Sequence, residues 1–239
     1  MLHENRPAGR SAAPQAALPA EKRRPADVNP YAQWVHEHPA VLLAEPTPAQ
    51  LHKQIDANGQ QPGGLVVDLG CGSGKFLLEH ARRDPHGRYV GFELRFKRLV
   101  KAARKVERAG LHNAWFLRES AERLGHYFAP ASLQAVHVNF PDPWPRRSDW
   151  KKRLLNPALL ALLARLLVPG GKFFLRTDHS GYFLHALSLL PDCTGLRVVA
   201  YSNDHHRVPA GSNAVRTEFE MLFQSLRKPV YSLVLERPA

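Results

Sequence analysis

Residues 135–153 read AVHVNFPDPWPRRSDWKKR, and this stretch decides where the predicted fold places its chemistry. Its first six residues are mostly apolar and β-prone, which predicts a buried strand that ends near Phe140. Prolines then occupy positions 141, 143 and 145. Because proline continues neither a helix nor a central strand, we expect a stiff loop directly after the strand.

The proline loop carries one carboxylate, Asp142, beside one large aromatic side chain, Trp144. A basic run follows it, made of Arg146, Arg147, Lys151, Lys152 and Arg153. A loop at the carboxyl end of a parallel strand lies where open α/β sheets bind ligands, and an acid, an aromatic and cations suit a flat polar base attached to phosphates. A proline-stiffened surface loop with solvated charges fits the motif equally well.

The chain has 239 residues, of which 44% are hydrophobic, enough for one α/β domain with a sizeable core. Its formal net charge of +12 favours a polyanionic partner, and nucleic acid ahead of a membrane surface. The two cysteines, Cys71 and Cys193, form neither a disulfide framework nor a zinc-binding pattern. We therefore expect free thiols, a cytoplasmic location and no bound metal.

No secretory signal is visible, because residues 1–10 lack an apolar segment. Residues 154–168 are apolar but too short and too interrupted to span a bilayer, so no membrane partner is expected. Residues 1–29 mix Ala, Pro, Arg and Lys without periodicity. This predicts a disordered basic tail, either solvated or folding onto RNA, followed by a single domain over residues 30–239.

A second informative stretch is LVVDLGCGSGKF at residues 65–76. Its apolar start predicts a buried parallel strand, Gly70, Gly72 and Gly74 predict a tight turn, and the apolar spacing after them predicts a helix. Bare glycine backbone between a strand and a helix lets a nucleoside cofactor approach closely. The G-x-G-x-G spacing differs from those of dinucleotide sites and P-loops, and an ordinary glycine turn is the alternative.

The segment RYVGFE at residues 88–93 predicts a second strand with Glu93 at its tip. An acid about 20 residues after the glycine loop is placed to accept hydrogen bonds from ribose hydroxyls. A lone glutamate at a strand end is usually solvated. Together with the glycine loop, however, Glu93 predicts a cofactor-binding role.

Four further strands complete the predicted sheet. Residues 113–117 and 172–176 each read as a strand, and the second of these delivers Asp178 to the same edge as the proline loop. Residues 196–201 and 230–235 are close enough along the chain to form a closing hairpin. The connection between them is expected to be a long polar loop of the kind that often carries function.

Two helices are predicted over residues 94–109 and 154–167, the second ended by Pro-Gly-Gly. The first would present a stripe of four cations at helical spacing, which is more often a solvated face than an RNA contact. These cations are Lys97, Lys101, Arg104 and Arg108. In the polar loop, we expect His205 and His206 to be exposed to solvent.

The order of strands, glycine turn, acidic strand tip and helices resembles the class I S-adenosylmethionine-dependent methyltransferase fold. That resemblance implies an α/β, Rossmann-like fold with a mostly parallel seven-stranded sheet, helices on both faces and a final antiparallel hairpin. Within this class, NFPDPWP at residues 139–145 resembles the tRNA (guanine-N7)-methyltransferases. The likeness extends from Leu65 to the end of the chain.

The resemblance implies S-adenosylmethionine as the cofactor and assigns residues to it. Asp68 matches the acid that opens the family's cofactor loop, Glu93 matches the acid that holds the ribose, and Asp142 matches the aspartate taken as catalytic. The other positions that the resemblance assigns to the cofactor are Gly70, Gly72, Gly74 and Asn139.

The resemblance also implies residues that bind the tRNA. Arg146 stands where the family has lysine, which keeps the charge but changes its geometry. Asp178 matches the family's Thr-Asp pair beside the substrate guanosine. The family's T-x-[FY]-E element is matched by Thr217, Glu218, Phe219 and Glu220.

The sequence departs from the family pattern at two places. Ser120-Ala121 stands where the family has Asp-Ala at the cofactor adenine, so that acid is absent or supplied by Glu119. Ser148-Asp149 replaces an Arg-His pair in the basic run, which bears on RNA contacts more than on the chemistry.

The resemblance implies methylation of guanine N7 in tRNA, at position 46 of the variable loop. An RNA-binding paralogue with weak or no methyl transfer is one alternative. A methyltransferase that acts on small molecules is another, for which neither the charge nor the proline loop gives a reason. No obligate protein partner is expected, and both a monomer and a homodimer are compatible with the sequence.

Overall fold

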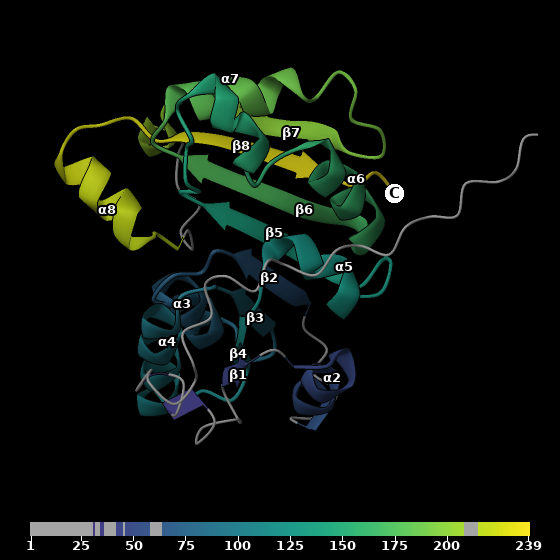
Figure 1. The fold of residues 1–239 in the computed structure, drawn as a ribbon, viewed down its shortest axis with the longest axis vertical. Helices are drawn as coiled ribbons and strands as arrows, with labels where there is room; N and C mark the ends of the chain where they lie inside the picture. Colours follow the sequence, from purple (N-terminus) through teal and green to yellow (C-terminus); the bar gives the residue numbers. More distant parts are fainter. Residues whose placement is uncertain (1–30, 32–33, 36–41, 45, 58–63, 208–214) are drawn as a thin grey trace, which may run out of the picture.

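The structure is a computed structural model, and it describes residues 31, 34–35, 42–44, 46–57, 64–207 and 215–239. The described residues form an eight-stranded sheet with helices on both faces (Figure 1). Its strands are β1 (Leu42–Ala44), β2 (Leu65–Leu69), β3 (Arg88–Phe92), β4 (Ala114–Arg118), β5 (Leu133–Asn139), β6 (Leu167–Thr177), β7 (Arg197–Ser202) and β8 (Tyr231–Glu236).

The α-helices are α2 (Pro48–Ala57), α3 (Lys75–Arg83), α4 (Phe96–Arg108), α5 (Leu124–Tyr127), α6 (Pro157–Leu166), α7 (Ser180–Ser188) and α8 (Glu218–Ser225). Short 3₁₀ helices are η3 (Ala121–Arg123), η4 (Arg147–Lys152) and η5 (His205–Arg207). In the described part of the chain, no helix is both long enough and apolar enough to cross a membrane.

The sheet is mostly parallel, as the sequence predicts. Its strand order is β1-β4-β3-β2-β5-β6-β8-β7, and only β8 runs antiparallel to its neighbours β6 and β7. All seven predicted strands are present, including the closing hairpin of β7 and β8. The short strand β1, which the sequence did not predict, adds an eighth at the edge beside β4.

The strand order reverses between β2 and β5. The chain places β3 and β4 on one side of β2, and β5 and β6 on the other. Strands β2 and β5 end in register, with Leu69 paired to Val138. A crevice that binds ligands forms at such a reversal in open α/β sheets, outside the carboxyl ends of the strands. The glycine turn after β2 and the proline loop after β5 both leave the sheet at this point.

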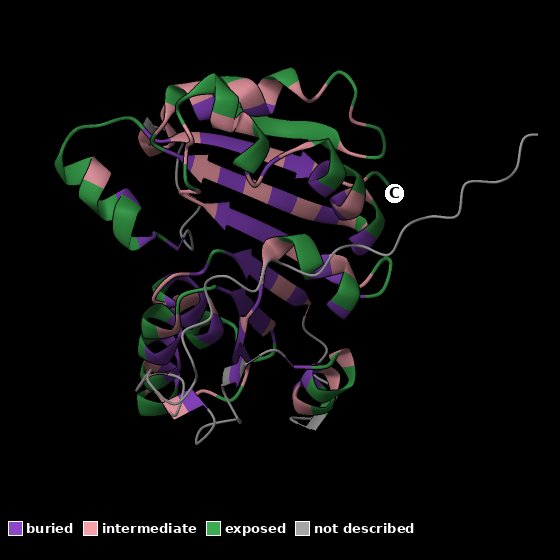
Figure 2. Cartoon of the chain, in the orientation of Figure 1, coloured by how far each residue is buried: buried purple, intermediate pink, exposed green. Residues whose placement is uncertain are grey.

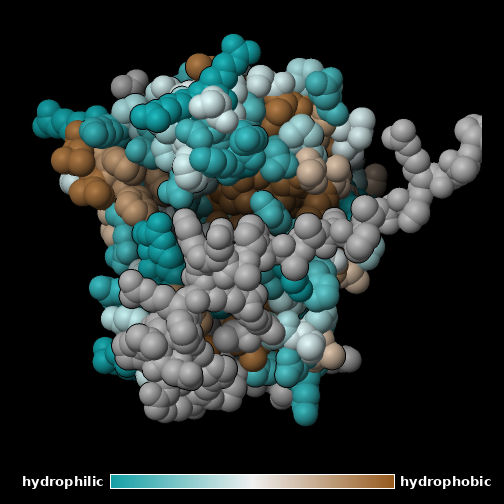
Figure 3. All heavy atoms as spheres, viewed as in Figure 1, coloured by the Kyte–Doolittle hydropathy of each residue, from teal (hydrophilic) through white to brown (hydrophobic). Residues whose placement is uncertain are grey.

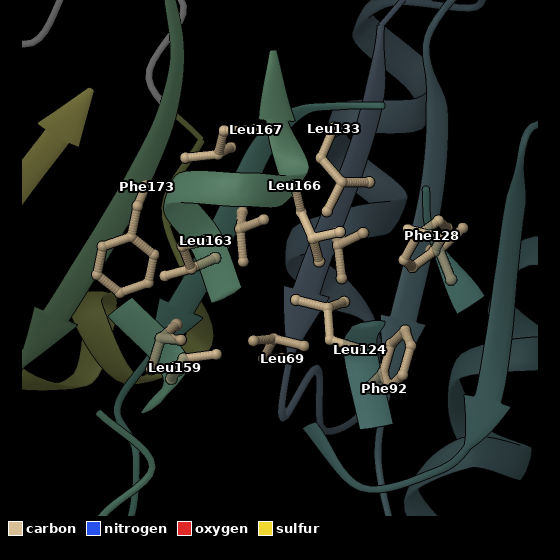
Figure 4. Close-up of a cluster of buried hydrophobic side chains, with 14 of the residues drawn as sticks. Leu69, Phe92, Leu124, Phe128, Leu133, Leu159, Leu163, Leu166, Leu167 and Phe173 are labelled. Atoms are coloured by element: carbon tan, nitrogen blue, oxygen red, sulfur yellow. The ribbon is translucent and has the colours of Figure 1, made fainter. Parts of the chain in front are cut away.

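One face of the sheet is covered by α2, α5, α6 and α7. Figure 4 shows the leucines of α6 directed at the sheet, where Leu163 and Leu166 lie near Leu69 and Phe173. These four side chains are almost completely buried. Because each buried leucine stabilises the fold by roughly 1.5–3 kcal/mol over an exposed one, this cluster fixes α6 and the start of β6.

The opposite face is covered by α3 and α4. Alternation along β3 separates the two cores, since Val90 and Phe92 belong to the first cluster and Tyr89 to the second. The predicted helix over residues 94–109 is confirmed as α4, and its apolar residues Leu99 and Val106 are fully buried.

Several predicted boundaries were wrong. Helix α6 begins three residues later than predicted, because the Asn156 side chain accepts a hydrogen bond from the Leu159 amide and Pro157 occupies the first turn. The predicted polar loop between the last two strands contains helix α8.

The exposure predicted for two histidines was also wrong. His205 and His206 are half-buried, and His205 Nδ1 lies 3.2 Å from Ser232 Oγ. Strand β7 is exposed along almost its whole length (Figure 2).

Candidate active site

The glycine turn after β2 leaves bare backbone facing open space. Gly70, Gly72 and Gly74 have φ angles of 80°, 57° and 73°, in the left-handed region that favours glycine. No atom lies within 4 Å of a Cβ built on Gly70. At Gly74, by contrast, such a Cβ would meet the Cβ of Ala102 at 2.6 Å, so this glycine allows α3 to pack against α4. The turn is anchored because the amides of Gly70 and Cys71 both donate to the Phe92 carbonyl oxygen.

Asp68 and Asn139 meet at the strand reversal. The Asn139 side-chain amide donates a hydrogen bond of 3.2 Å to the Asp68 carboxylate. Burial raises the pKa of Asp68 to about 7, although the Asn139 hydrogen bond opposes this shift. Asn139 Oδ1 is buried and has no hydrogen-bond partner among the described residues. A buried acceptor without a donor indicates a place for a ligand that carries a polar hydrogen.

Glu93 lies at the end of β3, on the other side of the glycine turn. Its side chain is almost buried, Oε1 accepts a hydrogen bond from the Arg95 amide, and Oε2 is 3.6 Å from Arg98 Nη1. Asp68, Glu93 and Asn139 therefore surround open glycine backbone with acceptors. This set of acceptors fits a cofactor that carries an amine and ribose hydroxyls, such as S-adenosylmethionine.

Glu119 and Ser120 follow β4, the next strand along the sheet. Both carboxylate oxygens of Glu119 have internal partners: Oε1 accepts from the Ser120 amide, and Oε2 from the Tyr127 hydroxyl at 2.9 Å and Arg123 at 3.2 Å. Ser120 caps η3. The structure thus places the two residues at the predicted edge, but it uses the Glu119 carboxylate to hold α5.

The proline loop after β5 has an unusual backbone. Phe140 and Trp144 have φ angles of 53° and 42°, in a region that residues other than glycine rarely adopt. The Phe140 amide donates to the Arg176 carbonyl oxygen, which holds the start of the loop on β6. Asp142 is exposed between these two residues, and none of the described residues makes a hydrogen bond to its carboxylate.

Arg153 fixes the proline loop through hydrogen bonds to its backbone. Its guanidinium donates to the carbonyl oxygens of Pro143 at 2.9 Å, Trp144 at 3.3 Å and Gly181 at 3.2 Å. It also lies over the rings of Trp150 and Tyr182, and only 2% of the residue is exposed. The sequence grouped Arg153 with the RNA-binding cations, and this prediction was wrong because its charge is enclosed by protein.

The other four cations of the basic run are exposed, as predicted. They lie in and directly before η4. Asp149, one of the two departures from the family pattern, accepts a hydrogen bond of 2.7 Å from Lys152. Lys152 also lies over the ring of Trp144, 4.6 Å from its centroid. Arg146, Arg147 and Lys151 are thus the exposed cations of this run that form no ion pair with a described residue.

Asp178 follows β6, which pairs with β5, so it lies at the same edge as the proline loop. Its side chain is exposed. The next residue, His179, begins α7, because its Nδ1 accepts a hydrogen bond from the Tyr182 amide. Thr177 is completely buried, and its hydroxyl accepts from the His179 amide.

Thr217, Glu218, Phe219 and Glu220 form the start of α8. The Thr217 hydroxyl and the Glu220 carboxylate accept from each other's backbone amides, which is a capping box. Glu220 is buried and also accepts a hydrogen bond of 2.9 Å from Arg176. Thr217 and Glu220 therefore hold the helix in place, whereas Glu218 and Phe219 are the two exposed members of the predicted substrate element.

Helix α8 lies against the glycine turn through contacts that the sequence did not predict. Glu218 accepts a hydrogen bond of 3.1 Å from the Ser73 hydroxyl and lies 3.6 Å from Lys105 Nζ on α4. Phe219 and Phe223 flank the ring of Phe140, with centroids 5.7 and 5.5 Å away. The apolar surface of α8 is exposed at the same edge (Figure 3). The Thr-x-x-Glu spacing at residues 217–220 was the available signal for this helix.

The strand order, the glycine turn and the acids at the ends of β2 and β3 define a class I S-adenosylmethionine-dependent methyltransferase. A family model described as "Putative methyltransferase" matches residues 62–233. A tRNA (guanine-N(7)-)-methyltransferase of Levilactobacillus brevis is 30% identical over 205 residues, which cover 86% of this chain and 94% of that protein. The chain belongs to the tRNA (guanine-N7)-methyltransferase family.

Two further comparisons are with other methyltransferases. A bifunctional glycosyltransferase/methyltransferase of Fusobacterium nucleatum is 35% identical over 159 residues, which cover 66% of this chain but only 24% of that longer protein. A solved structure of an antibiotic-related methyltransferase superimposes with a TM-score of 0.60 at 21% identity, covering 81% of this chain and 95% of that one. This last comparison supports the fold alone.

Proposed function

We propose that this protein transfers a methyl group from S-adenosylmethionine to N7 of guanine in tRNA, at position 46 of the variable loop. The observation that carries the proposal is the adjacency of two loops. The glycine turn follows β2 and the proline loop with Asp142 follows β5, and these two strands pair at the reversal of the sheet. A cofactor on the first loop and a base on the second would therefore be neighbours.

S-adenosylmethionine, when bound, supplies an electrophilic methyl group on a positively charged sulfur. We assign Glu93 to the ribose hydroxyls, because its carboxylate lies at a strand end beside open glycine backbone. Asp68 and Asn139 are assigned to the polar hydrogens of the amino-acid portion, which the free Oδ1 of Asn139 can accept. The peptide backbone of Gly70 and Gly72 forms the floor of the site.

Guanine N7 carries a free lone pair, so its attack needs no base to remove a proton. The protein's tasks are to align the reacting atoms and to hold the base. Asp142 is free to accept hydrogen bonds from the Watson–Crick edge of guanine and to offset the positive charge that N7 gains. Arg153 acts as a positioning residue, because it fixes the backbone carbonyl groups on both sides of Trp144, directly after Pro143.

The RNA itself is assigned to the exposed residues around this loop. Arg146, Arg147 and Lys151 would pair with phosphates, and Asp178 and Phe219 lie at the same edge for contacts to the nucleoside. The target base has to leave its tertiary contacts, which costs a few kcal/mol, and the phosphate contacts provide affinity that offsets this cost.

A second candidate, an RNA-binding paralogue with weak or no methyl transfer, is favoured by one observation. The family's acid at the cofactor adenine is Ser120 here, and the neighbouring Glu119 is tied to Tyr127 and Arg123. The protein would then lack that contact to the cofactor. We regard the loss as tolerable, because Glu93, Asp68 and the glycine turn are all in place.

We also propose a cytoplasmic protein that acts as a monomer or homodimer without an obligate protein partner. Both cysteines are free thiols, which suits a reducing compartment. The predicted basic tail over residues 1–29 lies outside the described residues, and residues 30–239 are proposed to form a single methyltransferase domain.

The test is to incubate the full chain with labelled S-adenosylmethionine and unmodified tRNA, and then to map 7-methylguanosine along the RNA. We expect one labelled guanine, at position 46, and no label in a tRNA that carries adenine there. The Asp142→Asn variant serves as the matched control, because we expect it to bind both ligands but to transfer the methyl group much more slowly. Label at another guanine would refute the position, whereas tRNA binding and cofactor binding without transfer would favour the paralogue.

A further inference from the structure

Helix α4 exposes a row of cations that the site described above does not use. We call Lys97, Lys101, Arg104 and Arg108 the basic face of α4; all four residues are exposed. Their spacing of four, three and four residues places them on one side of the helix, opposite the buried Leu99 and Val106.

The charges of the basic face are not neutralised within the described part of the chain. Helix α4 contains a single acid, Glu107, and no described carboxylate lies within 4 Å of Lys97, Lys101 or Arg108. The Arg104 guanidinium lies over the ring of Trp34. Like charges four residues apart slightly destabilise a helix, so this pattern opposes folding and suits a polyanionic ligand.

The basic face is continuous with the cofactor side of the site. Arg98, one turn from Lys101, lies 3.6 Å from Glu93, and Lys105 donates to the Ser73 carbonyl oxygen and contacts Glu218 of α8. Helices α4 and α8 lie on the side of the molecule toward which β5 and β6 point (Figure 1). An RNA whose guanine reaches Asp142 can therefore extend past α8 onto α4.

The shape of the surface favours RNA over a membrane. A helix that binds in a bilayer interface needs an exposed apolar side next to its cations. The apolar side of α4 is instead covered by the sheet, since Leu99, Ala103 and Val106 are fully buried. From Lys97 to Arg108 the helix rises about 16 Å, enough to meet more than one backbone phosphate.

We propose that the basic face of α4 binds the phosphate backbone of the RNA substrate, on the opposite side of α8 from the cations of η4. This inference rests on the proposed function, because it takes the partner to be the methylated RNA. It assigns a second phosphate-binding surface to the chain, and it implies that the RNA crosses the carboxyl edge of the sheet from η4 to α4.

The experiment compares two double variants that change the formal charge equally. Lys97→Glu with Lys101→Glu alters the basic face, and Arg104 is left intact because of its contact with Trp34. Lys53→Glu with Arg165→Glu serves as the control; both residues are exposed, on α2 and at the end of α6, away from the carboxyl edge. Binding to unmodified tRNA is measured from 50 to 200 mM salt, with cofactor affinity as a check on folding.

We expect the α4 pair to lower tRNA affinity at least about tenfold and to reduce the slope of log K against log salt by about two. The control pair should change affinity less than about threefold, and neither pair should alter cofactor affinity. Equal tRNA affinity of the two double variants would overturn the inference. It would also be overturned if the α4 pair kept its tRNA affinity but lost binding to acidic peptides or anionic vesicles. Failure of the wild-type protein to methylate tRNA would refute the proposed function instead, whichever way the two pairs bind.

Discussion

The guanidinium of Arg153 donates a hydrogen bond of 2.9 Å to the carbonyl oxygen of Pro143, the residue directly after Asp142. This contact joins the last residue of the basic run to the proline loop that precedes the run. The same guanidinium reaches Trp144 and Gly181, so a single buried cation holds the proline loop and the start of α7 together. The left-handed backbone of Trp144 persists because its surroundings fix it in place.

Replacement of Arg153 by methionine tests this role. Three backbone carbonyl oxygens would lose their donor, so we expect the free energy of unfolding to fall by about 3 kcal/mol. Arg153→Lys keeps the charge but not the planar guanidinium, so its free energy of unfolding should lie between those of the wild type and Arg153→Met. Urea denaturation measures the effect, and Arg147→Met, at an exposed position in the same run, should change stability by less than about 0.5 kcal/mol.

A positioning role also predicts a kinetic signature. In Arg153→Lys the single-turnover rate should fall while cofactor affinity stays unchanged, because only the loop that carries Asp142 moves. An unchanged stability in Arg153→Met, accompanied by weaker tRNA binding, would show that the guanidinium contacts RNA and would contradict the arrangement described here.

Asp68 provides a prediction about pH. Burial raises the pKa of its carboxyl to about 7 from an ordinary value of 3.8, so the folded protein holds this proton more tightly than the unfolded chain. The stability that Asp68 contributes is therefore complete below pH 4 and is lost as the pH rises to about 7, by about 3–4 kcal/mol. Asp68→Asn should remove this dependence.

The measurement has to be a difference between two proteins, because burial also lowers the pKa of His80 to about 4. That group acts in the opposite direction, since its contribution is lost as the pH falls toward 4. We expect the stability of Asp68→Asn relative to the wild type to increase steadily from pH 4 to pH 7 in urea titrations. A constant difference over this range would mean that Asp68 keeps an ordinary pKa.

Glu93 provides a prediction about cofactor affinity. Glu93→Ala should weaken S-adenosylmethionine binding by about 1.5–3 kcal/mol, because ribose hydroxyls would lose a charged acceptor. Glu93→Gln keeps the acceptor for the Arg95 amide and separates loss of charge from local rearrangement. Calorimetry measures both, with the exposed Glu122→Ala as control, and unchanged affinity in Glu93→Ala would refute the ribose assignment.

The parts of the site that the sequence predicted depend on local pattern. The apolar run before Gly70 and the prolines around Asp142 determine backbone conformation within a few residues, so the strand ends and both loops were correct. The burial of Arg153 depends on Tyr182 and Gly181, which lie in a different helix. Neighbours that distant in sequence leave no local pattern, so Arg153 reads as a fifth surface charge beside the four other cations of the run.

The ion pair of Arg176 and Glu220 was also beyond prediction from local sequence pattern. Their ion pair joins β6 to α8 across 44 residues, so neither residue alone reveals that Glu220 is buried. The resemblance assigned Glu220 to the substrate. In the structure its carboxylate faces Arg176 and the Thr217 amide, and this leaves fewer carboxylates for the chemistry.

Asp142 is predicted to act on methyl transfer more than on binding of either ligand. Its neighbours Pro141 and Pro143 stiffen the backbone, and Arg153 fixes the Pro143 carbonyl, so the carboxylate is aimed before the RNA arrives. The guanine becomes cationic only as the methyl group moves, so part of its attraction to Asp142 exists only in the transition state. An interaction of that kind raises the rate and leaves affinity nearly unchanged.

Asp142→Asn keeps the size of the side chain and removes its charge, so we expect the single-turnover rate to fall on the order of 10²–10³-fold with both ligands saturating. Asp149→Asn serves as the control, because its carboxylate pairs with Lys152 in the same segment. Near-normal turnover in Asp142→Asn would mean that the proline loop has only a structural role and that Asp142 is not the catalytic residue. The catalytic role would then pass to Asp178, since it is exposed at the end of the adjacent strand, whereas Glu220 is held by Arg176.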